Sequence, residues 1–488
     1  MTSSACYATR PNRIQSSESM LTKKKALVFI DHDLIVRHFI KSEVFGELEQ
    51  QYDVTYVFNV DESTEKKWLF TDIGSLGLRN IVRTSVTRAR MGSWYKLYAA
   101  SVLRNQRGTK NYGPRKRLMS AISGRLRTEY YSFLSLPGIF SLFRRHFMAR
   151  QGSYQPLVDL ILQQRPDIVL HPSVLAGYFI NELPPICNAL HIPLVVLMNS
   201  WDNPSAKALA TSYPDKLIVW GEQTRQHAIE YMRVPEQNVI SFGAAQFQIY
   251  REPVKESDSE LRAMFKVPVG LPILLYGGAS KGAHESRYLK MLDDCIEAGT
   301  IPRCHVIYRP HPWRGELGSG EKSFFSLGCK HISMDPFMES YYRRATTTGQ
   351  FGIEMADYKI TRKILHLISA VISPLSTILL EATILGKPVL MFYPNEELNQ
   401  EEGRFTKHAL EQAHFADFWG VPGVNVCNDK IEFPEKCRLL MAQTWDSEIS
   451  EGLLQHVRRF LVMDGPTYGE RLVKLANQLT DSVRQNAK

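Results

Sequence analysis

The sequence lacks the features that mark secreted, disulfide-rich and membrane-spanning proteins. Its 7 cysteines are an odd number and form no C-x-x-C pair, so we expect reduced thiols with neither a disulfide framework nor a zinc site. No run of about 18 apolar residues is present, and no membrane-spanning helix is expected. Residues 1–22 are polar without an apolar centre, which indicates a disordered tail and not a secretory signal. These absences predict a cytoplasmic protein.

Acidic residues are almost missing from residues 83–150, which hold 15 basic residues and one acid, Glu129. The whole chain has a net charge of only +9, so positive charge is concentrated in this segment. Ten aromatic residues lie among the basic ones. This mixture suits an anionic membrane surface or an acidic polymer, and we expect Arg115, Lys116 and Arg117 to form the contact patch. No nucleic-acid-binding module accompanies the charge, and nucleic acid is not an expected partner.

Short apolar runs alternate with segments of helical spacing along the chain. The runs that we expect to be strands are residues 26–30, 54–58, 167–171, 194–198, 216–220, 239–243, 273–277, 304–309, 368–373, 388–392 and 423–427. This alternation predicts an α/β protein with parallel sheets, and 488 residues favour two Rossmann-like domains over one core. The expected units are a tail at 1–22, a first domain at 23–255 with a basic insertion at 83–150, a second domain at 256–445, and terminal helices at 446–488.

Residues 372–390 hold the most informative motif, a strand followed by a hydroxyl-rich turn, a short helix and a second strand. We expect the helix to begin at Ser376 or Thr377 and to stop at Gly386. A helix N-terminus favours phosphate, and Glu381 lies one turn inside, where a carboxylate can accept hydrogen bonds from ribose hydroxyls. The motif predicts a nucleotide site, with an ordinary capped helix as the alternative.

A second motif follows the strand at 304–309, where Arg309 and His311 alternate with prolines that stiffen the turn. Ligands bind at the carboxyl ends of strands in open α/β sheets, so these two side chains are expected to face the same nucleotide. A glycine-rich turn at 277–282 gives weaker evidence, because it matches no phosphate-binding fingerprint. The predicted donor-binding residues are Gly277, Gly278, Ser280, Lys281, Arg309, His311, Ser373, Ser376, Thr377 and Glu381.

Candidate acid–base residues occur in the first half. Asp31, His32 and Asp33 end the first strand and are the leading candidates for a general base, and Asp202 is the next. Asp202 lies in a polar loop with Asn199, Ser200 and Trp201, which we expect to face a cleft; a simple Asx-type turn is the alternative.

The two motifs together, RPHPW at 309–313 and SPLSTILLEATILGKPVL at 373–390, resemble the donor-binding domain of glycosyltransferases with the GT-B architecture. The sequence is most similar to bacterial surface-polysaccharide transferases, including relatives of CDP-glycerol glycerophosphotransferases. SWDN at 200–203, VWGE at 219–222 and GAAQF at 243–247 resemble further elements of these proteins. The resemblance therefore adds Glu222 and Gln246 to the cleft, although Gln248 replaces the aspartate that usually ends the last element. An interdomain joint is the alternative role for these residues.

The resemblance implies two Rossmann-like domains that face each other across a cleft, with terminal helices that cross back to the first domain. It implies a glycosyltransferase that moves a sugar from a nucleotide-activated donor to a cell-surface polysaccharide or lipid-linked acceptor, at the inner face of the membrane. Retaining relatives often carry an E-x7-E pair, and Ser373 replaces its first glutamate, which favours inversion.

No carboxylate cluster lies near the expected phosphate site, so we expect no metal and no cofactor, with the nucleotide-sugar as substrate. The alternatives are a CDP-alcohol glycerophosphotransferase, whose HGT motif is missing here, and a UDP-sugar 2-epimerase-like isomerase. A further alternative from another class is a non-enzymatic basic scaffold that binds membrane or nucleic acid.

Overall fold

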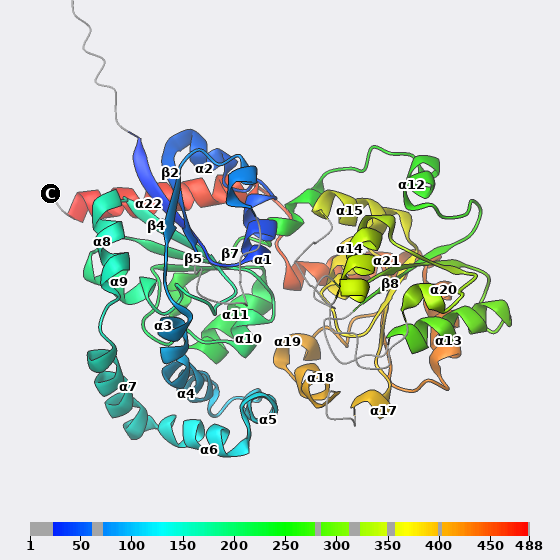
Figure 1. Cartoon of the computed structure of the whole chain (residues 1–488), viewed down its shortest axis with the longest axis horizontal. Coiled ribbons are helices and arrows are strands. Elements are labelled where there is room, and N and C mark those ends of the chain that lie inside the picture. The colour runs from blue at the N-terminus through cyan, green and yellow to red at the C-terminus, as the bar shows by residue number, and fades with distance from the viewer. Residues whose placement is uncertain are drawn as a thin grey trace, which may run out of the picture.

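The computed structural model describes residues 23–60, 72–278, 285–311, 323–348, 357–398 and 403–486. Within them the chain forms two parallel β-sheets, one from each half (Figure 1). The first has seven strands in the order β3-β2-β1-β4-β5-β6-β7, and the second has six in the order β10-β9-β8-β11-β12-β13. In both sheets the first strand lies in the interior. The next two strands are added on one side of it and the later strands on the other side, so the strand order reverses beside β1 and beside β8. This point is where open α/β sheets bind ligands.

The strands of the first sheet are β1 (Lys24–Ile30), β2 (Tyr52–Asn59), β3 (Ile81–Thr84), β4 (Ile168–Ser173), β5 (Leu194–Met198), β6 (Lys216–Val219) and β7 (Val239–Ser241). Those of the second are β8 (Ile273–Gly277), β9 (His305–Arg309), β10 (Ile332–Met334), β11 (Ala370–Ser373), β12 (Val389–Phe392) and β13 (Val424–Cys427). The predicted α/β class with two Rossmann-like sheets is confirmed. Sequence reasoning missed β3 and β10.

The first-half helices are α1 (Asp33–Ile35), α2 (Gly46–Gln51), α3 (Arg88–Ser93), α4 (Tyr95–Gln106), α5 (Tyr112–Ser123), α6 (Arg125–Leu134), α7 (Pro137–Gln151), α8 (Gln155–Gln164), α9 (Leu183–Ala189), α10 (Asn203–Ala206) and α11 (Glu222–Met232). The second-half helices are α12 (Asp258–Phe265), α13 (Glu285–Glu297), α14 (Pro336–Thr348), α15 (Tyr358–Leu367), α16 (Ile378–Ile384), α17 (Asn395–Leu398), α18 (Gly403–Leu410), α19 (Ala413–Ala416), α20 (Phe433–Gln443), α21 (Ser447–Phe460) and α22 (Tyr468–Asn486). Among the described residues, every helix is too short or too polar to span a bilayer.

The central strands are buried on both faces, which explains why they are nearly continuous apolar runs. Every residue of β5 and β8 is buried, as are the last five of β1. Helices cover both faces of each sheet (Figure 1). The loops that follow the carboxyl ends of the strands are therefore anchored to a buried sheet.

The basic insertion between β3 and β4 folds into helices that extend along the lower edge of the view in Figure 1. Helix α5 of this insertion contacts the second half of the chain. The side-chain oxygen of Asn111 accepts a hydrogen bond from the backbone N–H of Ala413 at 3.0 Å. Arg117 also pairs with Glu411 at 2.7 Å. The insertion therefore bridges the two halves.

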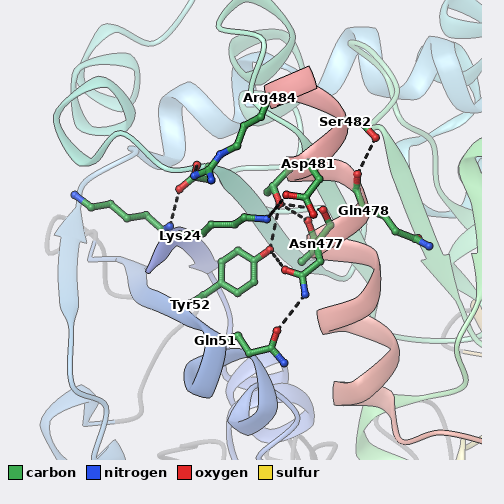
Figure 2. Close-up of polar contacts among 12 residues, drawn as sticks. Lys24, Gln51, Tyr52, Asn477, Gln478, Asp481, Ser482 and Arg484 are labelled. Atoms are coloured by element: carbon green, nitrogen blue, oxygen red, sulfur yellow. Dashed lines mark hydrogen bonds and ion pairs between the residues drawn. The ribbon is translucent and has the colours of Figure 1, made fainter. Parts of the chain in front are cut away.

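The last helix, α22, returns to the first sheet and packs beside α2 (Figure 2). Lys24 of β1 forms an ion pair with Asp481 at 2.6 Å, and the Tyr52 hydroxyl donates to Asn477 at 2.8 Å. Arg484 pairs with Asp167 at 2.9 Å. These contacts fasten the end of the chain to its beginning.

Candidate functional site

A cleft of about 680 Å³ lies between the carboxyl ends of the strands of the two sheets. Its residues come from both halves of the chain, which meet here although they are far apart in sequence. Twelve of the predicted site residues line it: His32, Asn199, Ser200, Asp202, Gln246, Gly277, Gly278, Arg309, His311, Ser376, Thr377 and Glu381. Ser280 and Lys281 lie outside the described residues.

The side chain of Arg309, at the end of β9, is fixed by hydrogen bonds from two of its three guanidinium nitrogens. Its Nε donates to Asp335 at 2.7 Å, and its Nη1 donates to Thr361 at 3.2 Å. Its Nη2 has no hydrogen-bond partner among the described residues, although it is buried. An unpaired buried donor is costly, and a charge-assisted bond to a ligand oxygen would satisfy it.

Two glycines let three segments approach closely at the floor of the cleft. A Cβ on Gly277 would lie 2.8 Å from the Ile378 side chain, and one on Gly278 would lie 2.8 Å from the backbone nitrogen of His311. The end of β8, the turn at 309–311 and the start of α16 therefore need glycine at these positions. This packing is a structural reason for the glycines, beside the predicted approach of a phosphate.

Helix α16 begins at Ile378 with Thr377 as its N-cap, one residue after the later of the two predicted starts, Ser376 and Thr377. Glu381 is buried, and the Tyr250 hydroxyl donates to its Oε2 at 2.6 Å. Burial raises the pKa of Glu381 above its ordinary value. Ser373 does not line the cleft; it is buried and donates to the Gly277 carbonyl at 2.8 Å, which ties β11 to β8.

Neither Asp31 nor Asp33 lines the cleft, because both carboxylates are buried in the first domain. Asp31 accepts a hydrogen bond from the Tyr178 backbone at 3.1 Å. His32 does reach the cleft, and its Nδ1 accepts from the Leu34 N–H at 3.1 Å. Burial lowers the pKa of His32 to about 4, so the ring is neutral with its proton on Nε2. His32 can therefore donate a hydrogen bond, but its Nδ1 lone pair is already used.

Sequence reasoning missed Arg37 and His38, which a short π-helix at Val36–Ile40 turns toward the cleft. The Arg37 guanidinium stacks over the Tyr358 ring at 4.1 Å. His38 Nδ1 lies 2.6 Å from Asn199 Oδ1, so the ring donates from Nδ1. Burial lowers the pKa of His38 to about 3, which leaves Nε2 as an unprotonated acceptor at neutral pH. Their position just after the first strand was the available signal in the sequence. The π-helix itself is seen only in the structure, and π-helices recur at functional sites.

Some side chains of the polar loop after β5 face the cleft, and others face the core. Asp202 lines the cleft together with Lys207, another residue that sequence reasoning missed, and burial lowers the pKa of Lys207. Trp201 instead points into the core, where it makes edge-on contacts with Phe415 and Phe460 at 5.2 and 5.9 Å. Its role is therefore packing.

Glu222 and the basic triplet lie away from the cleft. Glu222 is about half exposed at the start of α11. Arg115 is buried, and burial lowers its pKa. Lys116 pairs with Glu129 at 2.8 Å, and Arg117 pairs with Glu411. Lys116 therefore pairs within the insertion, whereas Arg117 joins the insertion to the second half of the chain.

Replacing Asp31 with asparagine is expected to flatten the dependence of stability on pH. Burial raises the pKa of Asp31 from 3.8 to about 7, so the folded state keeps a proton that the unfolded state has released. The contribution of Asp31 to stability is then fully present below about pH 4 and is lost as the pH rises through about 7. Urea unfolding at about pH 5 and about pH 8 measures this. Equal pH dependence in the parent and Asp31→Asn would contradict the expectation.

No protein-family model matches the sequence, and the search of curated proteins gave no significant match. A proposed UDP-N-acetylglucosamine 2-epimerase from Listeria monocytogenes is similar in structure, with a TM-score of 0.51 and 9% identity over 94% of this chain and 96% of that one. The UDP-N-acetylglucosamine 2-epimerase from Rickettsia bellii gives 0.49 and 11% over 95% and 98%. The wall teichoic acid polymerase TagF gives 0.48 and 9% over 96% and 91%. Together with its two facing sheets, the first of these likenesses shows that the chain has the GT-B fold.

Proposed function

We propose that this protein is a glycosyltransferase that moves a sugar from a nucleotide-activated donor to a cell-surface polysaccharide or lipid-linked acceptor. One observation carries the proposal. The cleft is lined by Arg309, whose Nη2 has no hydrogen-bond partner among the described residues, and also by Asp202 and the neutral ring of His38 from the other half of the chain. A fixed cation on one wall and acceptor groups on the other suit transfer from a phosphate leaving group to a hydroxyl.

The second-domain wall is proposed to bind the donor. Arg309 and His311 would meet the diphosphate, and Glu381 would accept hydrogen bonds from the ribose hydroxyls. The Tyr250 hydroxyl already fixes one oxygen of this carboxylate, which supports an orienting role for Glu381. No divalent metal is needed in this proposal, since protein cations can stabilise the charge that develops on the departing diphosphate.

The first-domain wall is proposed to bind the acceptor and to supply the base. In an inverting transfer, the acceptor oxygen forms a bond to the anomeric carbon as the bond to the diphosphate breaks, and the base takes the hydroxyl proton. Of the four predicted bases, His32 and Asp202 line the cleft. Asp202 is the proposed base, because the Nδ1 lone pair of His32 already accepts from the Leu34 N–H. His38 is the further candidate, because its Nε2 is an unprotonated acceptor in the same cleft.

An isomerase of the same fold is the second candidate, since a proposed 2-epimerase is similar in structure. Such an enzyme would bind the same donor but would need no acceptor. The two functions therefore share the second-domain wall and differ in what the first-domain wall does.

A thermal-shift panel of UDP, GDP, CDP and CMP tests the proposal. One nucleotide should raise the melting temperature selectively, because a ligand at about 100 times its dissociation constant stabilises by about 2.7 kcal/mol. His311→Ala and Glu381→Ala should each reduce this shift without unfolding the protein. Product analysis with the matching nucleotide-sugar then separates the candidates. A transferase releases nucleoside diphosphate only with an acceptor, whereas an isomerase changes the sugar without one. No shift with any nucleotide would overturn both.

A further inference from the structure

Helices α6 and α7 expose aliphatic and aromatic side chains on their outer face. Leu126 is 87% exposed, Leu142 is 73% exposed and Phe133 is 55% exposed. On α6, residues 126, 130 and 133 follow helical spacing and share one face, opposite the buried Tyr131 and Leu134. The fifteen residues of α7 include none that is buried. Large exposed apolar side chains gathered on one region mark an interaction site.

The same region carries positive charge without counter-charge. Arg125, Arg127, Arg145 and Arg150 are exposed and form no ion pair or hydrogen bond among the described residues. The single acid of residues 83–150 is Glu129, and it is paired with Lys116. We call this set of exposed side chains on α5, α6, α7 and the α6–α7 turn the outer face; its members are Ile122, Leu126, Tyr130, Phe133, Leu136 and Leu142 with Arg125, Arg127, Arg145 and Arg150.

The outer face belongs to a well-packed substructure. Tyr131 and Met119 pack in a small core with Leu103 of α4. Arg107 donates to the Ser132 carbonyl at 3.0 Å, and the Lys96 ammonium lies 4.8 Å from the centre of the Tyr130 ring. The inner side of α6 is therefore packed against α4 and α5, and its exposed side chains lie on the remaining face.

The insertion is also joined to the cleft. The side chains of Gln106 and Asn111 both donate to the Ser205 carbonyl, at 2.9 and 2.8 Å. Ser205 lies in α10, beside Asn203, which lines the cleft. In Figure 1 helices α5, α6 and α7 lie along one edge of the molecule, so an extended surface could meet them together.

We propose that the outer face binds a lipid bilayer that contains anionic lipid. Arginines near an anionic headgroup layer are attracted to it. Leucine and phenylalanine side chains lower their free energy when they leave water and enter the boundary between headgroups and acyl chains. A soluble acidic polymer would engage the arginines but would leave Leu126 and Leu142 in water. The apolar half of the outer face therefore favours a bilayer. This proposal is independent of the proposed reaction, because it concerns a surface outside the cleft.

Vesicle flotation with the full chain tests the proposal, using phosphatidylcholine vesicles with and without phosphatidylglycerol. The parent protein should float only with phosphatidylglycerol, and less at high salt. Leu126→Ser with Leu142→Ser, and separately Arg125→Glu with Arg127→Glu, should each lower the partition coefficient by about tenfold or more. The matched control is Val269→Ser with Ile431→Ser, two side chains that are each 82% exposed elsewhere, and it should bind like the parent.

Two results would overturn the proposal. The first is a parent protein that ignores anionic vesicles at low salt. The second is full binding by the Leu126→Ser, Leu142→Ser variant together with loss of binding in the arginine variant. That pattern would assign the outer face to a soluble polyanion. All the substituted side chains are exposed, and thermal melting should confirm that each variant is folded.

Discussion

Replacing Arg309 with lysine is expected to weaken binding of the nucleotide donor by about ten- to a hundredfold. The Arg309 guanidinium is fixed by Asp335 and Thr361, which leaves Nη2 for a ligand oxygen. Lysine keeps a cation beside the buried Asp335 but cannot reproduce the fork geometry. Charge-assisted hydrogen bonds contribute about 1.5–3 kcal/mol, which corresponds to the expected loss in affinity. Calorimetric titration with the nucleotide selected by the thermal-shift panel is the measurement.

The matched control is Arg362→Lys. Arg362 and Arg309 have side chains of equal exposure, 11%, and each pairs with a carboxylate, but Arg362 pairs with Glu252 outside the cleft. Both variants should lose some stability, and only Arg309→Lys should lose affinity. If the two bind nucleotide equally well, the donor phosphate does not lie beside Arg309.

Replacing Gly221 with alanine is expected to lower the free energy of unfolding by about 3 kcal/mol or more. An added Cβ would lie 2.6 Å from the carbonyl carbon of Phe460 and 2.7 Å from the nitrogen of Leu461. These are backbone atoms of the segment that carries the chain back toward the first sheet, where Val462 donates to the Trp220 carbonyl at 2.9 Å. Overpacking typically costs about 1–3 kcal/mol, and a clash between two backbone segments lies at the high end.

Urea unfolding of Gly221→Ala, with Gly452→Ala as control, measures the effect. Gly452 lies in α21, the helix that leads into the same segment, and a Cβ there would meet nothing within 4 Å. The control should gain about 0.5–1 kcal/mol, because alanine is a better helix former than glycine. A Gly221→Ala variant as stable as the parent would mean that the two segments separate without cost.

The two strands that sequence reasoning missed are informative about its limits. Both β3 and β10 are edge strands, with four and three residues, and β3 has no buried residue. An edge strand need not be apolar on both faces, so its sequence carries little signal. The interior strands β5 and β8 are buried throughout and were found with the correct bounds.

Sequence reasoning predicted the second-domain wall of the candidate site better than the first-domain wall. The turns after β9 and β11 carry prolines, glycines and a capped helix, which predicted where Arg309 and Glu381 would lie. On the first-domain wall the same reasoning chose Asp31 and Asp33, which the fold buries, and missed His38 and Lys207. Short polar segments do not reveal which side chain faces inward.

By itself the sequence determined the two parallel sheets and the second-domain motifs, because strands buried on both faces must be apolar and turns must carry the residues that their geometry demands. Only the tertiary structure decided which polar groups meet. His38 and Asn199 are 161 positions apart, and Tyr250 and Glu381 are 131 apart, yet each pair shares a hydrogen bond beside the cleft. Such contacts, and the burial that shifts the pKa values of these groups, depend on how distant segments pack, which no local pattern records.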